Sequence, residues 1–284
     1  MHTALMISPH ADDAAAFCGG TLAKLSDQGW KVVMVRVTDD CKDSVGLDME
    51  EAKKRNAEEL RQAADILGIS EIVELGYETD CLADVSLTAL RERIVYMFRK
   101  YRPYAVFTFD SYGLWEDNMD HVRVAQAAEE AFWVSAFDLH HPEHFEEGLE
   151  PFCVCEKWRF ARQLPRTTYV EDVTDYMDKK IAAFAAHKTM VKNMLNRYVL
   201  QLKTWGRRVP LLEQSMEDPR GLLDAFLREQ AKETAKHYGL GEDRLAEPFR
   251  LERFGDLEGM FQMFSEPIAG AEEPPRRKGL EPEE

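Results

Sequence analysis

Hydrophobic and polar positions in the first 110 residues alternate between two patterns. Four short apolar runs have the length of buried strands: residues 4–7, 31–37, 71–75 and 104–109. Stretches with apolar residues at helical spacing follow the first three runs, at about residues 14–28, 50–67 and 87–101. This alternation predicts parallel strands joined by right-handed crossovers.

The second half of the chain is less regular. It predicts strands and helices without strict alternation: strands at residues 152–160, 168–170 and 248–254, and helices at about 174–186 and 222–238. From Glu266 the sequence is rich in Glu and Pro and has little apolar surface to bury. We therefore expect a Rossmann-like α/β domain over residues 1–265, with a mostly parallel sheet, helices on both faces and a C-terminal extension. Residues 266–284 are predicted to form a flexible tail.

The amino-acid composition indicates which classes of binding partner to expect. The 284 residues include 52 acidic and 36 basic side chains, giving a net charge of −16. Without clustered positive charge, nucleic acid and anionic membranes are not expected as partners. No apolar run approaches the ~18 residues that span a bilayer, and no signal peptide is evident, so a cytoplasmic location is expected. The five cysteines are irregularly spaced, which predicts that they are reduced thiols. The sequence leaves open whether the chain forms a homo-oligomer.

Two polar clusters follow strands of the same predicted sheet. His10, Asp12 and Asp13 come directly after the first strand, and His121 ends a cluster after the fourth. Parallel strands deliver such residues to one edge of the sheet. Two imidazoles and one carboxylate, with a fourth position left for water, are typical of a catalytic zinc site. We therefore expect His10, Asp13 and His121 to bind one zinc ion, with Asp12 as general base.

Each signal has a simpler explanation when it is taken alone. Asp12 and Asp13 could cap a helix, and His10 could be a hydrogen-bonded turn residue. The His-rich segment at residues 140–144 is expected to be a polar loop. A non-catalytic nucleotide-binding module of the Rossmann type is a third possibility, but it would need a Gly-rich phosphate loop after the first strand, where this chain has a His-Asp-Asp turn.

Several motifs make the chain resemble a known family, the LmbE-like or PIG-L zinc-dependent N-deacetylases. The resemblance covers most of the first 190 residues, with one further match near the C-terminus. The motifs are Pro9-His10-Ala11-Asp12-Asp13, Cys18-Gly19-Gly20-Thr21, Val37-Thr38-Asp39, Arg55-Asn56-Ala57-Glu58, Tyr101-Arg102-Pro103, Asp120-His121, Ala186-His187-Lys188 and Ala246-Glu247-Pro248-Phe249-Arg250.

The resemblance implies a zinc-dependent hydrolase that removes an acyl group, most simply acetyl, from a small polar and sugar-like N-acylated molecule. It supports the zinc ligands and the base named above, and it places Arg55, Asp80 and His187 where the family contacts substrate. Arg55 could equally pair with a glutamate on its own helix. His187 could be a hydrogen-bonded, half-buried helix residue.

The chain departs from the family pattern at Asn118, where the family usually has a histidine that helps stabilise the oxyanion. Asn118 can still donate a hydrogen bond to an oxyanion, but it cannot carry a proton. Asp120 is expected to orient its neighbours, with a solvated helix cap as the alternative. The residue after Asp13 is Ala14, where the family commonly has an acidic side chain.

A second reaction on the same scaffold stays open. Some members of the superfamily hydrate a double bond of a dicarboxylate-like substrate, and one such hydratase also has asparagine at the position of Asn118. That enzyme lacks the aspartate that corresponds to Asp12, which this chain retains. The sequence therefore favours the deacetylase and keeps the hydratase as its alternative.

Overall fold

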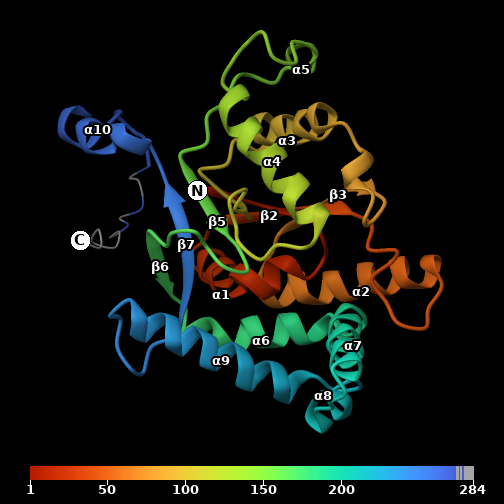
Figure 1. Ribbon diagram of the computed structural model, residues 1–284. Coiled ribbons are helices and arrows are strands. Elements are labelled where there is room, and N and C mark those ends of the chain that lie inside the picture. Colours follow the sequence, from red (N-terminus) through yellow and green to blue (C-terminus); the bar gives the residue numbers. More distant parts are fainter. Residues whose placement is uncertain (273–274, 276, 278–284) are drawn as a thin grey trace.

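A computed structural model describes residues 1–272, 275 and 277, and in this part of the chain seven strands form one sheet in the order β3-β2-β1-β4-β5-β7-β6 (Figure 1). Strands β1 to β5 pair in parallel, whereas β7 runs antiparallel to both β5 and β6. The strands are β1 (Thr3–Ser8), β2 (Lys31–Thr38), β3 (Glu71–Tyr77), β4 (Ala105–Phe109), β5 (Glu156–Phe160), β6 (Tyr169–Asp172) and β7 (Ala246–Glu252). The predicted mostly parallel sheet is confirmed, although β5 begins four residues later than the sequence pattern indicated.

Helices cover both faces of the sheet, as predicted. Helices α1 (Asp13–Asp27) and α2 (Met49–Leu67) pack on one face, and α3 (Leu87–Tyr101) and α4 (Met119–Val134) on the other (Figure 1). Side chains of β1 alternate between the two resulting cores, because successive residues of a strand point to opposite faces. The central strand is therefore buried on both sides.

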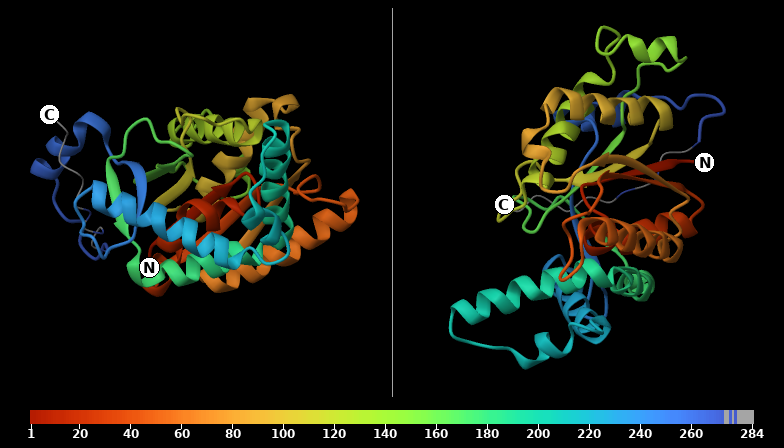
Figure 2. Two further views of the ribbon diagram at one scale, coloured as in Figure 1. Left: turned by 60° about the horizontal axis from the view of Figure 1, so that its bottom comes forward. Right: turned by 90° about the vertical axis from the view of Figure 1, so that its right-hand side faces the viewer.

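The C-terminal extension forms an outer layer against α1 and α2 (Figures 1 and 2). It consists of α6 (Met177–Ala186), α7 (Lys188–Thr204), α8 (Pro210–Gln214) and α9 (Arg220–His237), after which the chain returns to the sheet as β7. The sequence predicted α6 and α9 but not α7. Two short helices, α5 (Glu143–Glu146) and α10 (Glu258–Phe264), lie outside these layers.

A buried ion pair fastens this extension to α1. Helix α1 is broken at Cys18, whose φ of −136° and ψ of 19° are not helical. Beyond the break, the backbone N–H groups of Gly20 and Thr21 donate to the Glu247 carboxylate at 3.0 and 2.8 Å, and the Thr21 hydroxyl donates at 2.6 Å. The Lys180 ammonium of α6 donates to the same carboxylate at 2.6 Å. We call Gly20, Thr21, Lys180 and Glu247 the Glu247 hub.

The position of Gly20 has no room for a larger side chain. A Cβ atom there would lie 2.7 Å from the Cβ atom of Val173, which is closer than two carbon atoms approach without displacement. The close contact brings the segment before α6 directly against α1.

The predicted flexible tail falls partly on residues 273–274, 276 and 278–284, which lie outside the described residues. Within the described part, Glu272 pairs with the N-terminal ammonium of Met1 at 2.7 Å. Arg277 lies 3.5 Å from Glu156 and 3.6 Å from Glu171, with its guanidinium 4.9 Å from the Trp158 ring centroid. In the same described part, no helix is long and apolar enough to cross a membrane.

Candidate active site

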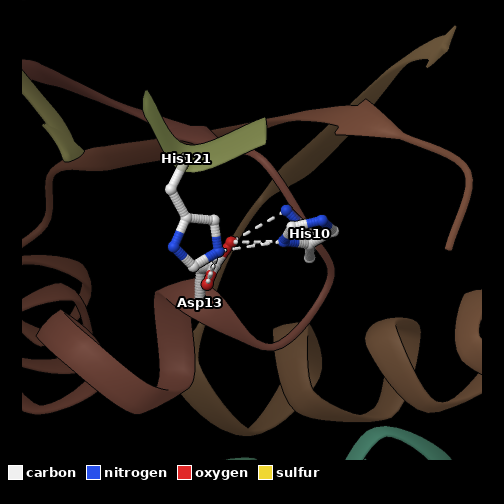
Figure 3. A group of neighbouring side chains, drawn as sticks. All are labelled: His10, Asp13 and His121. Atoms are coloured by element: carbon white, nitrogen blue, oxygen red, sulfur yellow. Dashed lines mark hydrogen bonds and ion pairs between the residues drawn. The ribbon is translucent and has the colours of Figure 1, made fainter. Parts of the chain in front are cut away.

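Three side chains meet at the carboxyl edge of the sheet, between β1 and β4 (Figure 3). His10 Nδ1 lies 3.1 Å from His121 Nε2 and 3.5 Å from Asp13 Oδ2. His121 Nε2 lies 3.3 Å from the other carboxylate oxygen of Asp13, Oδ1. One ligand atom from each residue lies within 4.8 Å of the other two, and we call this group of three side chains the triangle. Atoms bound about 2.0–2.1 Å from a tetrahedral zinc ion lie roughly 3.3 Å apart. The measured separations of 3.1 to 3.5 Å are close to this value, so the three residues predicted to bind a metal could hold one ion.

The strand order explains why these residues meet. Strands β2 and β3 extend the sheet on one side of β1, whereas β4 and β5 extend it on the other. Such a change of direction opens a crevice at the carboxyl ends of the two central strands. His10 follows β1 directly, and His121 lies in the first turn of the helix after β4.

Asp120 contacts His10 at Nε2, the ring nitrogen that is not directed at Asp13 and His121. Its Oδ2 lies 3.3 Å from His10 Nε2 and accepts the backbone N–H of Asp80 at 2.7 Å, while Oδ1 accepts the N–H of Leu82 at 3.2 Å. Asp120 is fully buried, so it is not the solvated helix cap that the sequence left open. The helix cap is Asn118, whose side-chain oxygen accepts the N–H of Asp120 at 2.8 Å.

His121 is held by two other residues. The ring of Phe109 stacks on it with a centroid distance of 4.0 Å. The carboxylate oxygen Oε2 of Glu116 lies 3.0 Å from His121 Nδ1, the ring nitrogen that faces away from the triangle. Both imidazoles therefore have one nitrogen toward the triangle and a carboxylate at the other nitrogen.

The electrostatics of the cluster favour a cation. Burial opposes charge at His10 and His121, yet the surrounding carboxylates raise the pKa of both imidazoles. Burial would likewise raise the pKa of Asp13, but the two imidazoles hold it well below its usual range. The half-buried Asp12 behaves in the opposite way, since burial and the charge of Asp13 raise its pKa to about 8. A divalent cation would satisfy this excess of negative charge.

Two more carboxylates that sequence reasoning missed face His10. A ligand atom from each of Asp40 and Asp43 lies within 4.8 Å of His10 and of one another. Burial raises the pKa of both, and it brings Asp40 to about 7. Asp40 directly follows Asp39, at the end of β2. The rule that selected His10 would therefore have found it, because β2 neighbours β1.

The residues predicted to contact substrate lie in different surroundings. Arg55 is exposed on α2 and donates to Glu51 at 2.6 Å, the pairing that the sequence left open. Asp80 is exposed, with a left-handed φ of 60°, and its backbone binds Asp120. Their contacts with substrate stay predictions.

His187 lies between α6 and α7 and is only 1% exposed. Within the described residues neither of its ring nitrogens has a hydrogen-bond partner, which is unusual for a buried histidine. Burial lowers its pKa to about 4, against an opposing effect of the Asp13 charge. Burial thus favours the neutral form of His187.

The His-rich segment at residues 140–144 has a structural explanation. His144 is buried, with Nδ1 3.1 Å from an Arg99 nitrogen and Nε2 2.8 Å from a Glu92 carboxylate oxygen. Both ring nitrogens are therefore already occupied, as expected for a residue that fastens a loop to α3.

The chain is similar to known deacetylases. Residues 5–132 match the family model of PIG-L, described as GlcNAc-PI de-N-acetylase. The chain is 30% identical over 190 residues to a diacetylchitobiose deacetylase of Thermococcus kodakarensis, a match that covers 65% of this chain and 68% of the relative.

Two solved structures share the fold. One is an N,N′-diacetylchitobiose deacetylase from Pyrococcus horikoshii in complex with an inhibitor, with a TM-score of 0.71, 24% identity and coverage of 92% of this chain and 85% of the other. The other is a 4-carboxy-2-hydroxymuconate hydratase from Pseudomonas putida, with a TM-score of 0.64, 17% identity and coverage of 88% and 96%. At these identities the likeness shows the fold alone.

Proposed function

We propose that this chain, which belongs to the PIG-L family of deacetylases and so to the amide hydrolases, removes an N-acetyl group from a small sugar-like molecule with the help of one zinc ion. The observation that carries the proposal is the grouping of His10, Asp13 and His121, whose nearest nitrogen and oxygen atoms lie 3.1 to 3.5 Å apart. The relative whose name includes diacetylchitobiose supports a sugar-like substrate.

His10, Asp13 and His121 would hold the ion, since imidazole nitrogen and carboxylate oxygen are ligands that zinc accepts. When bound there, zinc would polarise the substrate carbonyl and make a water easier to ionise. Asp120 keeps His10 in place throughout, because its own two oxygens are fixed by backbone N–H groups.

Asp12 would take a proton from the attacking water and deliver it to the amine that leaves. A positive charge beside Asp12 favours its carboxylate form, which this role needs, and so offsets the effect of burial on its pKa. The amide N–H₂ group of Asn118 would donate to the oxygen that becomes negative, because the side-chain oxygen already caps α4.

The loop before His121 supports a substrate with flat, partly apolar faces. It carries two largely exposed aromatic side chains, Tyr112 at 71% and Trp115 at 76%. Aromatic rings that project into solvent beside a polar site are suited to stacking on sugar rings.

The C-terminal extension is proposed as part of the same catalytic unit, residues 1–265.

The test combines metal analysis with a substrate panel. Purified protein should carry close to one zinc per chain, and chelation should abolish the release of amine from N-acetylglucosamine or diacetylchitobiose until zinc is restored. N-acetyl amino acids and acetylpolyamines are the comparison substrates. Full activity of the chelated protein, or no amine from any N-acetyl compound, would contradict the proposal.

The hydratase is the second candidate, and Asn118 is the observation that favours it. A hydratase would consume a conjugated alkene and release no amine. Loss of alkene absorbance from unsaturated dicarboxylates, measured beside amine release, separates the two reactions. Hydration without amide cleavage would replace the deacetylase while keeping the metal site.

A further inference from the structure

We propose that Glu116 is a positioning residue, which fixes the orientation and the ring tautomer of His121 for metal binding. The inference rests on the proposed metal site and deepens it. No sequence signal singled out Glu116, which lies in the loop between β4 and α4.

The contact joins two buried atoms. Glu116 Oε2 and His121 Nδ1 are 3.0 Å apart, and their side chains are only 9% and 4% exposed. Among the described residues neither atom has a hydrogen bond of good geometry, and Arg162 Nε, at 3.3 Å, lies farther from Glu116 Oε2 than His121 does. Each is therefore the nearest polar partner of the other, and a buried carboxylate oxygen left without one would be costly.

Other contacts hold the Glu116 carboxylate in this place. Its Oε1 accepts the backbone N–H of Asn118 at 2.9 Å and the side chain of Arg162 at 3.3 Å. The loop itself is also constrained, because Leu114 pairs with Gln163 in an isolated β-bridge. Glu116 is thus attached to the backbone that starts α4 and to the segment after β5.

The neighbouring residue shows what this position requires of the backbone. Trp115 has a φ of +61°, a left-handed conformation that costs a non-glycine residue free energy. Trp115 gains little burial in return, since it is 76% exposed. The left-handed turn is what places Glu116 inward while its neighbour stays outside.

The chemical consequence concerns both ring nitrogens of His121. A carboxylate at Nδ1 favours the tautomer with its proton on that nitrogen, which leaves the Nε2 lone pair free to face the triangle. It also limits rotation of the ring. Loss of such a partner typically weakens metal binding roughly 10- to 100-fold.

The experiment compares wild type with Glu116→Gln and Glu116→Ala. Zinc affinity is measured by competition with a chromophoric chelator, and the visible spectrum of the cobalt-substituted protein reports the geometry of the ligands. The matched control is Asp117→Asn, which removes a carboxylate one residue away that is exposed and pairs with Arg197. Melting of the metal-free proteins shows that every variant is folded.

We expect both Glu116 variants to bind zinc about 10- to 100-fold more weakly and to change the cobalt spectrum, with Asp117→Asn unchanged. Because Gln keeps the size of the side chain, the Glu116→Gln variant tests the loss of the carboxylate even if Glu116→Ala fails to fold. Zinc affinity within twofold of wild type and an unchanged cobalt spectrum in Glu116→Gln would overturn the inference alone. A wild-type protein that binds no zinc would overturn the proposed function and the inference with it.

Discussion

Helix α1 carries two buried polar clusters that differ in how completely their groups are paired. Beyond the break at Cys18, the Glu247 hub surrounds one carboxylate with four donors at 2.6 to 3.0 Å. At the start of the same helix, carboxylates and imidazoles crowd around Asp13 and have mainly one another as partners. Nearby, His187 is buried with no hydrogen-bond partner in the described part of the chain.

The difference separates a structural cluster from the cluster that we propose to be reactive. A fully paired buried network stabilises one arrangement and has nothing to offer a ligand. The cluster at Asp13 instead has pKa values away from their ordinary range and donor atoms close together, as expected of the proposed metal site. Burial alone would not distinguish the two clusters.

The largest expected effect is on the reactive cluster. Asp12→Asn should lower turnover about 10²- to 10⁴-fold, because it removes the positioned base, while zinc stays bound. The contrasting variant, Asp13→Ala, should lose both zinc and turnover. Metal content and amine release are measured on the same preparations. Asp12 occupies the N-cap position of α1 but makes no side-chain cap hydrogen bond. Amide hydrolysis by Asp12→Asn at the wild-type rate would therefore remove Asp12 from the mechanism.

Substitutions in the Glu247 hub should lower the stability of the fold and leave metal binding unchanged. Glu247→Ala leaves the Lys180 ammonium buried without its partner, which we expect to lower the free energy of unfolding by about 3–5 kcal/mol. Glu252→Ala on the same strand is the control, since its partly exposed ion pairs should contribute less than about 1 kcal/mol. Denaturant unfolding measures both. A folded Glu247→Ala protein should still bind one zinc, and loss of zinc from it would break the comparison.

Asn118 lies at the border of the comparison, because its oxygen has a structural role and its N–H₂ group a proposed catalytic one. Asn118→Asp keeps the helix-cap oxygen but removes the donor, so turnover should fall about 10²- to 10³-fold with little loss of stability. Asn118→His, which restores the residue that the family usually has, should retain turnover. Equal activity of Asn118→Asp and wild type would remove Asn118 from the mechanism.

His187 should make the stability of the protein depend on pH. Its pKa in the folded protein is about 4, below the ordinary value of 6.5, so the unfolded chain binds the extra proton first as pH falls. Stability should therefore be complete above about pH 6.5 and decline by about 3 kcal/mol as pH falls to 4. Melting of the metal-free His187→Met protein should lack this part of the pH dependence. His237→Met, at an exposed position, should keep it.

The smallest effect is expected at the C-terminal end. Removing residues 273–284 deletes Arg277 beside the buried Glu156, which keeps the hydrogen bond from the Trp158 indole at 3.0 Å, so the truncation should cost about 1–3 kcal/mol and leave turnover unchanged. Removing only residues 278–284 keeps Arg277 and is the matched control. The two truncations should have the same kinetic constants, and a loss of turnover in either would extend the catalytic unit beyond residue 265.

The sequence predicted the parts of the molecule that depend on local pattern. Regular alternation predicted β1 to β4 and the helices between them, and polar residues at the strand ends predicted the meeting of His10 and His121. Glu116 could not be found in this way. Its place depends on a left-handed tryptophan, and no periodicity indicates such a turn.

The C-terminal half was harder to predict, because its elements are fixed by distant partners. Glu247 contacts Thr21, which is 226 residues away in the sequence. Only one residue, His187, separates α6 from α7. A helical pattern interrupted at His187 does not reveal that the chain turns there and buries the imidazole. The burial of His187 follows from the packing of α6 and α7, which a single segment of sequence does not encode.

The spacing of the three proposed ligands along the chain also bears on the order of folding events. His10 and Asp13 are neighbours in one turn, whereas His121 is 111 residues away from His10. An unfolded chain therefore offers zinc only a weak local pair of donors, and the third arrives after β1 and β4 have docked. Zinc added during refolding should be captured late, so the rate of its uptake would time the closure of that long loop.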